Sequence, residues 1–205
     1  MATIRLTDPD LETLIPMSLI KEFCRIDNDL DNSCSEILID ARSGAVSAGE
    51  HRTHIIWGQA DFEFRWNILH GLTVESSVKF PITPVQSVKE VKLFSVDNTE
   101  TVLTAADYNF QKSSIEFGHS FAELRLITPP PAGTVDLRVQ AVVGWDGETF
   151  PRDLKMWALN RIASLYDVRG DIQDLGGKTF VKMPRDHTDS LLDKWIVYGH
   201  PRHCI

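Results

Sequence analysis

Three acidic residues early in the chain have the spacing of a calcium-binding loop. Asp27, Asp29 and Asp31 match the D-x-D-x-D opening of such a loop, in which alternate side chains supply oxygen ligands. The loop also needs glycine at its sixth position and a bidentate glutamate at its twelfth, where this chain has Asn32 and Leu38. Without that glutamate the ligand set is incomplete. We therefore interpret the acidic run as capping residues between two helices.

Two histidine-containing segments are the other candidates for a metal site. His51 and His54 are three residues apart and would share one helical face, but no third ligand is near in sequence. The segment 200–204 combines two histidines with Cys204. One short cluster of this kind is more typical of adventitious binding than of a built site. We predict a solvated histidine pair, no metal and no cofactor.

Motifs for catalysis or nucleotide binding do not occur in the sequence. It has no Gly-rich phosphate loop, no H-E-x-x-H and no G-x-S-x-G. Trp145, Trp157 and Trp195 are not interleaved with basic residues, so core or interface positions fit them better than stacking on nucleobases. We predict that the protein is not an enzyme. The alternative is a small hydrolase with a site between helices and strands, recognisable by a cleft with convergent carboxylates or histidines of shifted pKa.

The amino-acid composition narrows the possible classes of function further. The 205 residues include 21 basic and 29 acidic side chains, a net charge of −8. An acidic chain is poorly suited to gripping DNA phosphates, although it suits a surface that DNA slides past. No run of about 18 apolar residues occurs, and the first residues lack an apolar signal core, so we expect no membrane segment and no secretion. The three cysteines, an odd number, fit a reducing compartment.

The clearest element in the chain is a helix over residues 150–169. Pro151 suits the first helical position, where a missing N–H costs nothing. Asp153 lies in the first turn, where the helix dipole favours a negative charge, and Gly170 suits the C-terminal cap. One face is mostly apolar at three- and four-residue steps, through Leu154, Trp157, Ala158, Ile162, Leu165 and Val168. A helix with such a face needs a packing partner.

Three further helices surround this one in the sequence. A short helix capped by Ser18 runs through residue 26, and a second runs from about Leu30 to Ala48, so the chain starts with a helical hairpin. After a loop over 171–185, a last helix runs from about residue 186 or 188 to Tyr198. Gly199 and Pro201 end it.

Between these helices the apolar period changes to two, which predicts six or seven short strands. The first 15 residues are weakly patterned. The strands are expected at 55–57 and 62–66 (or as one long strand with a bulge or break near Gly58), 74–80, 85–96, 122–127 and 135–143, with short segments at 101–103 and 108–110. We predict an α+β fold in which a small antiparallel β unit interrupts a helical core. The expected divisions are 1–51 for the N-terminal helices, 52–148 for the β unit and 149–205 for the remaining helices and tail.

Several of these stretches resemble the head–tail connector (adaptor) proteins of tailed bacteriophages, in particular larger members with an inserted β unit. The likeness covers most of the chain and consists of patterns of packing residues. Residues 150–169 resemble the signature hydrophobic-Pro-x-x-Leu-Lys-x-x-Ala, followed by Leu-Tyr-x-x-Arg. The other matching stretches are Ser18–Asp27 with the acidic run after it, Ile39–Arg42, Val142–Trp145 and Leu191–Trp195.

The resemblance implies a structural virion protein at the head–tail interface, assembled in the host cytoplasm. Identical subunits, about a dozen, would form a ring beneath the portal protein, extend the DNA channel and present a surface to the next tail or stopper protein. DNA would pass without sequence-specific binding. We expect helix 150–169 to pack on the N-terminal hairpin and the β unit to face outward or towards a neighbour. Another virion part or a cellular scaffold protein with the same core is the further alternative.

The loop over 171–185 and the C-terminal tail are the expected contacts with the portal or tail. Both segments are poor in self-packing, and such segments often become ordered on binding. The candidate interface residues are Lys178, Phe180, Lys182, Arg185, Trp195, Tyr198 and Arg202.

Overall fold

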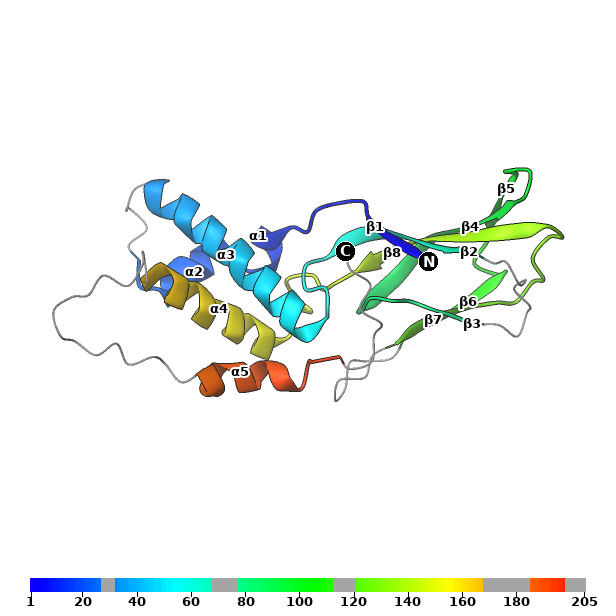
Figure 1. Cartoon of the computed structure of the whole chain (residues 1–205). Helices are drawn as coiled ribbons and strands as arrows, with labels where there is room; N and C mark the ends of the chain where they lie inside the picture. The colour runs from blue at the N-terminus through cyan, green and yellow to red at the C-terminus, as the bar shows by residue number, and fades with distance from the viewer. Residues whose placement is uncertain (27–31, 68–76, 113–120, 168–184, 198–205) are drawn as a thin grey trace.

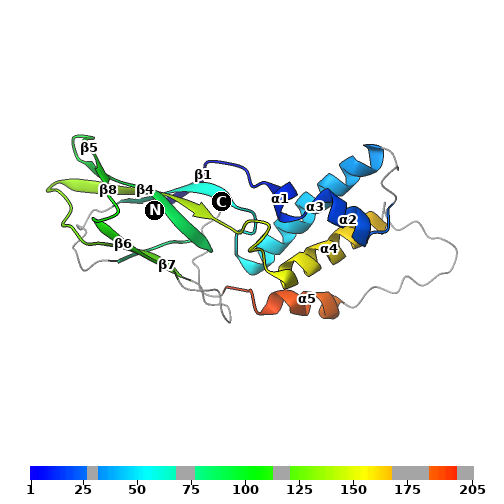
Figure 2. The same cartoon turned by 180° about the vertical axis from the view of Figure 1, so that it is seen from behind.

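Helices gather at one end of the molecule and strands at the other (Figure 1), and the view from behind shows the same separation (Figure 2). The computed structural model describes residues 1–26, 32–67, 77–112, 121–167 and 185–197. Five helices and eight strands lie within these ranges. The fold is therefore α+β, with a helical core and antiparallel strands, as the sequence predicts.

The helical end is built around α4, which packs against α2, α3 and α5. This arrangement confirms the expected packing of helix 150–169 on the N-terminal helices. Leu38 and Ala45 of α3 join Leu154 and Ile162 of α4 in one buried apolar cluster. The helices are α1 (Leu11–Leu14), α2 (Met17–Phe23), α3 (Asn32–Thr53), α4 (Arg152–Asp167) and α5 (Arg185–Asp193).

Local chemistry sets where these helices start and stop. The Asp10 carboxylate accepts the N–H of Glu12 at 2.9 Å and so caps α1. At the end of α3, His54 adopts a left-handed backbone with a φ of 59° and breaks the helical path. The N-terminal turn of α4 begins after Pro151, which lacks the N–H that a helix interior requires.

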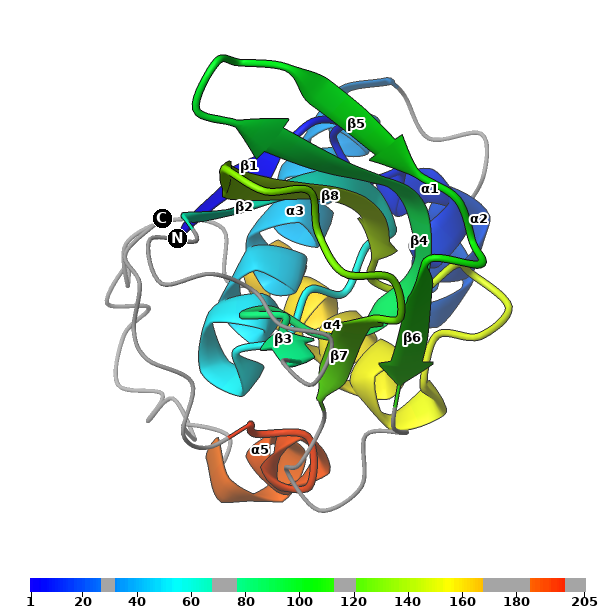
Figure 3. The same cartoon turned by 90° about the vertical axis from the view of Figure 1, so that its right-hand side faces the viewer.

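The strands form two antiparallel sheets that enclose a second apolar cluster. Seen along the molecule, the sheet with order β1-β2-β8-β4-β5 lies above the sheet with order β3-β7-β6 (Figure 3). Side chains alternate as strand geometry requires: Phe62 and Phe64 of β2 point into the cluster, and Glu63 between them points out. The strands are β1 (Ala2–Arg5), β2 (Ala60–Asn67), β3 (Ser77–Lys79), β4 (Val85–Ser95), β5 (Glu100–Leu103), β6 (Tyr108–Lys112), β7 (Ala122–Leu126) and β8 (Thr134–Val143).

Several expectations about individual elements are wrong. Ile55–Trp57 is not a strand, because α3 extends to Thr53 and the chain then crosses between the two clusters. Helix α2 begins at Met17 with Pro16 at its cap, not with Ser18 as the capping residue. In the weakly patterned opening segment, β1 and α1 are present, and β1 pairs with β2 in the larger sheet.

Some expectations concern residues outside the described ranges, namely the acidic run 27–31, most of the loop 171–185, and the tail from 198. The three-part division of the chain stays a prediction. The structure adds one observation to it: residues 2–5, expected with the helices, belong to a sheet.

Candidate assembly interface and its support

The helical and sheet ends meet where two chain segments lie side by side. Trp145 donates its N–H to the Trp57 carbonyl at 2.9 Å, and Gln59 donates to the Trp145 carbonyl at 3.1 Å. Gly144 has a φ of +97°, and a Cβ there would lie 2.3 Å from the Gly58 carbonyl oxygen. Only glycine permits both this backbone and this approach. The junction is therefore built from backbone contacts that fix how the two ends are joined.

Trp57 anchors the end of α3 to this junction. Its ring is fully buried against Gly49, where a Cβ would come within 2.1 Å of the ring. Its indole N–H donates to the Thr53 hydroxyl at 3.1 Å, and that hydroxyl donates to the Gly49 carbonyl at 2.8 Å. The last turn of α3 and the crossing segment thus form one hydrogen-bonded unit.

Glu50 completes this unit with an ionisable group. Its carboxylate accepts the N–H of Trp57 at 2.7 Å. Burial raises the pKa of the Glu50 carboxyl above its usual value, although bonds from the N–H groups of Trp57 and Gly58 and the charge of Arg5 act in the opposite direction. Glu50 is therefore an acid whose ionised form is partly penalised by the fold.

Helix α5 is fastened to the core by Asp189. Its carboxylate accepts the Trp157 indole N–H at 3.2 Å and pairs with the Arg52 guanidinium at 2.6 Å. Burial alone would raise the pKa of Asp189, but the hydrogen bonds from Arg52 and Trp157 outweigh it and hold the pKa below its ordinary value. One carboxylate thus joins α5 to both α3 and α4.

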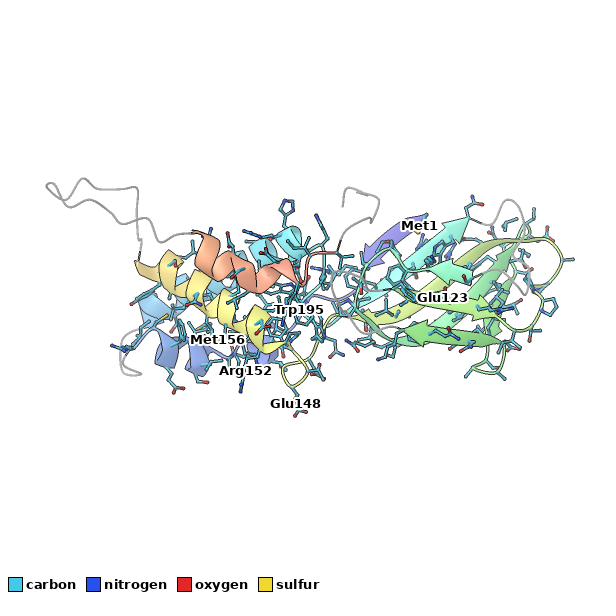
Figure 4. All side chains as sticks on the ribbon, turned by 90° about the horizontal axis from the view of Figure 1, so that it is seen from below. Met1, Glu123, Glu148, Arg152, Met156 and Trp195 are labelled. Carbon is cyan, nitrogen blue, oxygen red and sulfur yellow. The ribbon has the colours of Figure 1, made fainter. Side chains whose placement is uncertain are left out.

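The segment after α5 is held at the face of the core that adjoins the junction (Figure 4). Trp195 packs edge-on against Trp145, with ring centroids 6.0 Å apart. Lys194 forms an ion pair with Asp153 in the first turn of α4. Val197 donates its N–H to the Thr53 carbonyl at 3.0 Å. Three contacts therefore hold the segment 194–197 on the helical core.

The predicted interface residues are placed only in part by the structure. Trp195 is partly buried on the helical core and its indole nitrogen is buried, so the described part of the chain gives this side chain a packing role. Arg185 is the first residue of α5. The others, Lys178, Phe180, Lys182, Tyr198 and Arg202, lie outside the described residues, and their role stays a prediction.

Sequence reasoning did not identify the residues that position this segment. Arg52, Asp189 and Thr53 lie on elements far apart in the chain, and each by itself resembles an ordinary surface or capping residue. The available signal was a short polar helix with two leucines, Leu191 and Leu192, and Asp189 two residues before them. That signal does not name the partner, because a lone aspartate has no pattern that identifies its distant arginine.

The candidate metal sites receive no support in the part of the chain that the structure describes. His51 and His54 are exposed neighbours, with ring centroids 6.4 Å apart, and no group of three potential ligands occurs among the described residues. The acidic run 27–31 and the segment 200–204 lie outside those residues.

The hydrolase alternative predicts a cleft with convergent carboxylates at the junction. A small hollow of about 140 Å³ is present there, and Asp10 and Asp146 are among its lining residues. Hydrogen bonds from Thr13 lower the pKa of Asp10, and those from Thr149 lower the pKa of Asp146. Both carboxylates are committed to backbone turns. This arrangement caps local structure and supplies no acid or base with a raised pKa.

The described helices include none that combines the length and apolar character needed to cross a membrane.

Comparison with known proteins relates the fold to three particle structures. No protein-family model matches the sequence, and the search of curated proteins gives no match. A chain in the neck of an empty GTA particle, computed with C6 symmetry, matches with a TM-score of 0.69 and 19% identity over 98% of this chain and 100% of that chain. A chain in the virion of a native gene transfer agent (GTA) particle gives the same values. One in the neck of a native GTA particle, computed with C12 symmetry, has a TM-score of 0.62, also at 19% identity and the same coverage. At this identity, the likeness shows a shared fold over the full length.

Proposed function

We propose that this chain is a structural component of the neck of a phage-like particle, a connector (adaptor) that forms a ring between portal and tail. The observation that supports this most is the fold likeness to neck chains over 98% of this chain and all of theirs. The match includes helices and sheets together, so it concerns a whole subunit and not a common submotif.

The physical properties of the chain fit this role. A net charge of −8 gives weak attraction to DNA phosphates, which suits passage of DNA through the ring without retention. The junction joins the two ends through backbone contacts, and a subunit of fixed shape is what a closed ring of identical copies requires. The segment beyond residue 197, which follows the fastened end of α5, and the loop over 171–185 are the proposed contacts with portal and tail proteins.

Native mass spectrometry of the full chain, alone and mixed with the portal protein of the same particle, tests this function. We expect a closed oligomer of a single size, either alone or on the portal. A chain that stays monomeric in both samples contradicts the proposal. In the described part of the chain no observation favours an enzyme: Asp10 and Asp146 act as caps, and Glu50, whose pKa is raised, accepts the N–H of Trp57.

A further inference from the structure

The five-stranded sheet has two open margins in the described part of the chain. The order β1-β2-β8-β4-β5 leaves β1 and β5 with one neighbour each, and β5 forms the upper margin of the sheet in Figure 3. An unpaired sheet edge presents a row of N–H and C=O groups to which another strand can bind. These margins are therefore places where the sheet can be extended.

The hydrogen bonds of β1 show which of its backbone groups point outward. In an antiparallel ladder, alternate residues direct both their N–H and C=O groups towards the neighbouring strand. Leu6 donates to the Asp61 carbonyl at 2.8 Å, in register with the pairing of β1 and β2. It follows that Thr3 and Arg5 direct their backbone groups away from β2.

The outward backbone groups of β5 are identified by its pairing with β4. Ser95 donates to the Thr99 carbonyl at 3.1 Å, next to the pair formed by Phe94 and Glu100. Glu100 and Val102 therefore direct their backbone N–H and C=O groups away from β4. Each open edge therefore has two residues, spaced two apart, whose backbone N–H and C=O groups point outward.

Each of the two edge strands also carries an exposed apolar side chain on the outer face of the sheet. Ile4 is 38% exposed and Val102 is 53% exposed. Ile4 lies opposite Glu63, and Val102 lies opposite Lys92, so both project from the outer face of the sheet. Edges that stay unpaired are commonly protected by lysine or proline, and neither residue occurs in β1 or β5. The one charged side chain of each strand adds nothing to this match, because Arg5 lies over the Phe62 ring on the inner side of the sheet and Glu100 pairs with Lys92 on the outer face.

Strand direction identifies which kind of partner fits. The four successive pairings from β1 to β5 are all antiparallel, so β1 and β5 run in the same direction. A copy related by rotation about a ring axis brings its β1 alongside β5 in parallel orientation, a head-to-tail contact. A two-fold axis would instead pair like edges and stop at a dimer.

The outer face of this sheet offers less to a partner than its edges do. Its charges are already paired within the chain: Lys92 lies 2.9 Å from Glu100, Arg138 lies 3.0 Å from Asp136, and Arg65 pairs with Glu63. The shallow depression of about 480 Å³ beside them is lined by the same arginines. A partner binding there would have to displace formed ion pairs.

We propose that the five-stranded sheet continues from one copy of this chain to the next by parallel pairing of β5 with β1 of the neighbouring copy. The proposal rests on the ring assembly of the proposed function and names the strands that form it. Every copy then uses one edge of each kind, and the sheet closes on itself around the ring.

Two substitutions in the full chain test this pairing. Val102→Glu places a charge at the β5 edge, on a side chain that is exposed within the subunit. Its matched control is Val96→Glu, because Val96 is 70% exposed and lies just after β4, off the ladder. Thr3→Pro removes an outward N–H, a change that an edge strand tolerates. Lys79→Pro, at the edge strand β3 of the other sheet, is its control.

Native mass spectrometry over a range of concentrations, with thermal melts of each variant, gives the readout. We expect Val102→Glu and Thr3→Pro to lose the ring and both controls to keep it. If Thr3→Pro fails to fold, Val102→Glu and hydrogen exchange decide: in the wild-type ring the amides of Arg5 and Val102 should gain protection.

The outcomes separate this inference from the function. Rings that persist in both edge variants, or a wild-type species that stops at a dimer, overturn the edge pairing. The proposed function survives persistent rings, because another surface then forms them. A wild-type chain that stays monomeric, alone and with portal protein, overturns both.

Discussion

At the scale of single residues, Glu50 combines a structural bond with an unfavourable charge. Its carboxylate accepts the Trp57 N–H at 2.7 Å, yet burial raises its pKa. A raised pKa in the folded state gives stability that is fully present below the unfolded pKa and is lost as pH rises through the folded pKa. The ordinary value for this group is 4.5. Glu50 therefore contributes a decrease in stability as pH rises above about that value.

Glu50→Gln should remove this pH dependence, because glutamine keeps an acceptor oxygen and cannot ionise. Urea unfolding at several pH values should show the wild type losing stability relative to Glu50→Gln as pH rises. Glu50→Ala should be less stable than Glu50→Gln by about 1–3 kcal/mol, since it leaves the buried N–H groups of Trp57 and Gly58 without their acceptor. Parallel pH profiles for wild type and Glu50→Gln would contradict this role.

Asp189 has the opposite pH behaviour. Its folded pKa lies below the ordinary 3.8, so its contribution is present above the unfolded pKa and is lost as pH falls through the folded pKa. Asp189→Asn should weaken the attachment of α5 by about 0.5–1 kcal/mol, because solvent screens the partly exposed pair with Arg52 and asparagine keeps an acceptor oxygen for Trp157. Hydrogen exchange should then increase in α5 and leave β8 unchanged. Equal exchange in α5 of both proteins would show that this carboxylate does not hold the helix.

At the scale of elements, α3 contains two glycines whose surroundings differ. A Cβ at Gly49 would lie 2.1 Å from the buried Trp57 ring, while nothing lies within 4 Å of a Cβ at Gly44. Gly49→Ala should lower the free energy of unfolding by about 1–3 kcal/mol, because the added methyl group overpacks the space that the Trp57 ring fills. Gly44→Ala should stabilise by about 0.5–1 kcal/mol, because alanine favours helix. Thermal or denaturant unfolding measures both, and a stabilised Gly49→Ala would mean that Trp57 does not pack there.

Elements with a clear period were predictable from sequence, and elements made by distant pairing were not. The apolar steps of 150–169 and the alternation of 135–143 reflect burial on one face, so α4 and β8 follow from them. Strand β1 has four exposed residues, so it lacks any burial pattern and is defined by its bonds to β2. The segment 55–57 shows the opposite case, in which a strand is predicted from apolar residues but is not formed. These residues are apolar because they cross between two clusters, with Trp57 in one and Ile56 in the other.

The attachment of α5 was beyond sequence reasoning for the same reason. Asp189 lies 32 residues after Trp157 and more than one hundred residues after Arg52 in the sequence. No local sequence pattern indicates contacts over such separations. The sequence analysis predicts Trp195 as an interface residue, within the last helix. In the structure its ring packs against Trp145, with 6.0 Å between the ring centroids, and its interface role stays a prediction. Its proposed interface role therefore depends on what the neighbouring segment binds.

At the scale of the whole molecule, removing the end of the chain tests whether the residues that dock on the portal differ from those that stabilise the fold. Val197 is the last described residue that bonds to the core, through the Thr53 carbonyl. A chain truncated after Tyr198 should keep its melting temperature within about 2 °C, because the removed residues follow that bond. Co-sedimentation with portal protein should be weakened. Unchanged docking of the truncated chain would exclude the C-terminal tail as a portal contact.

The most direct test of the central claim is a cryo-electron microscopy reconstruction of the neck of the particle that carries this protein. We predict a closed cyclic ring of this chain between portal and tail, with the helical and sheet ends of each copy visible as separate densities. A neck whose density this fold does not fit, or particles in which this chain forms no ring, would contradict the account.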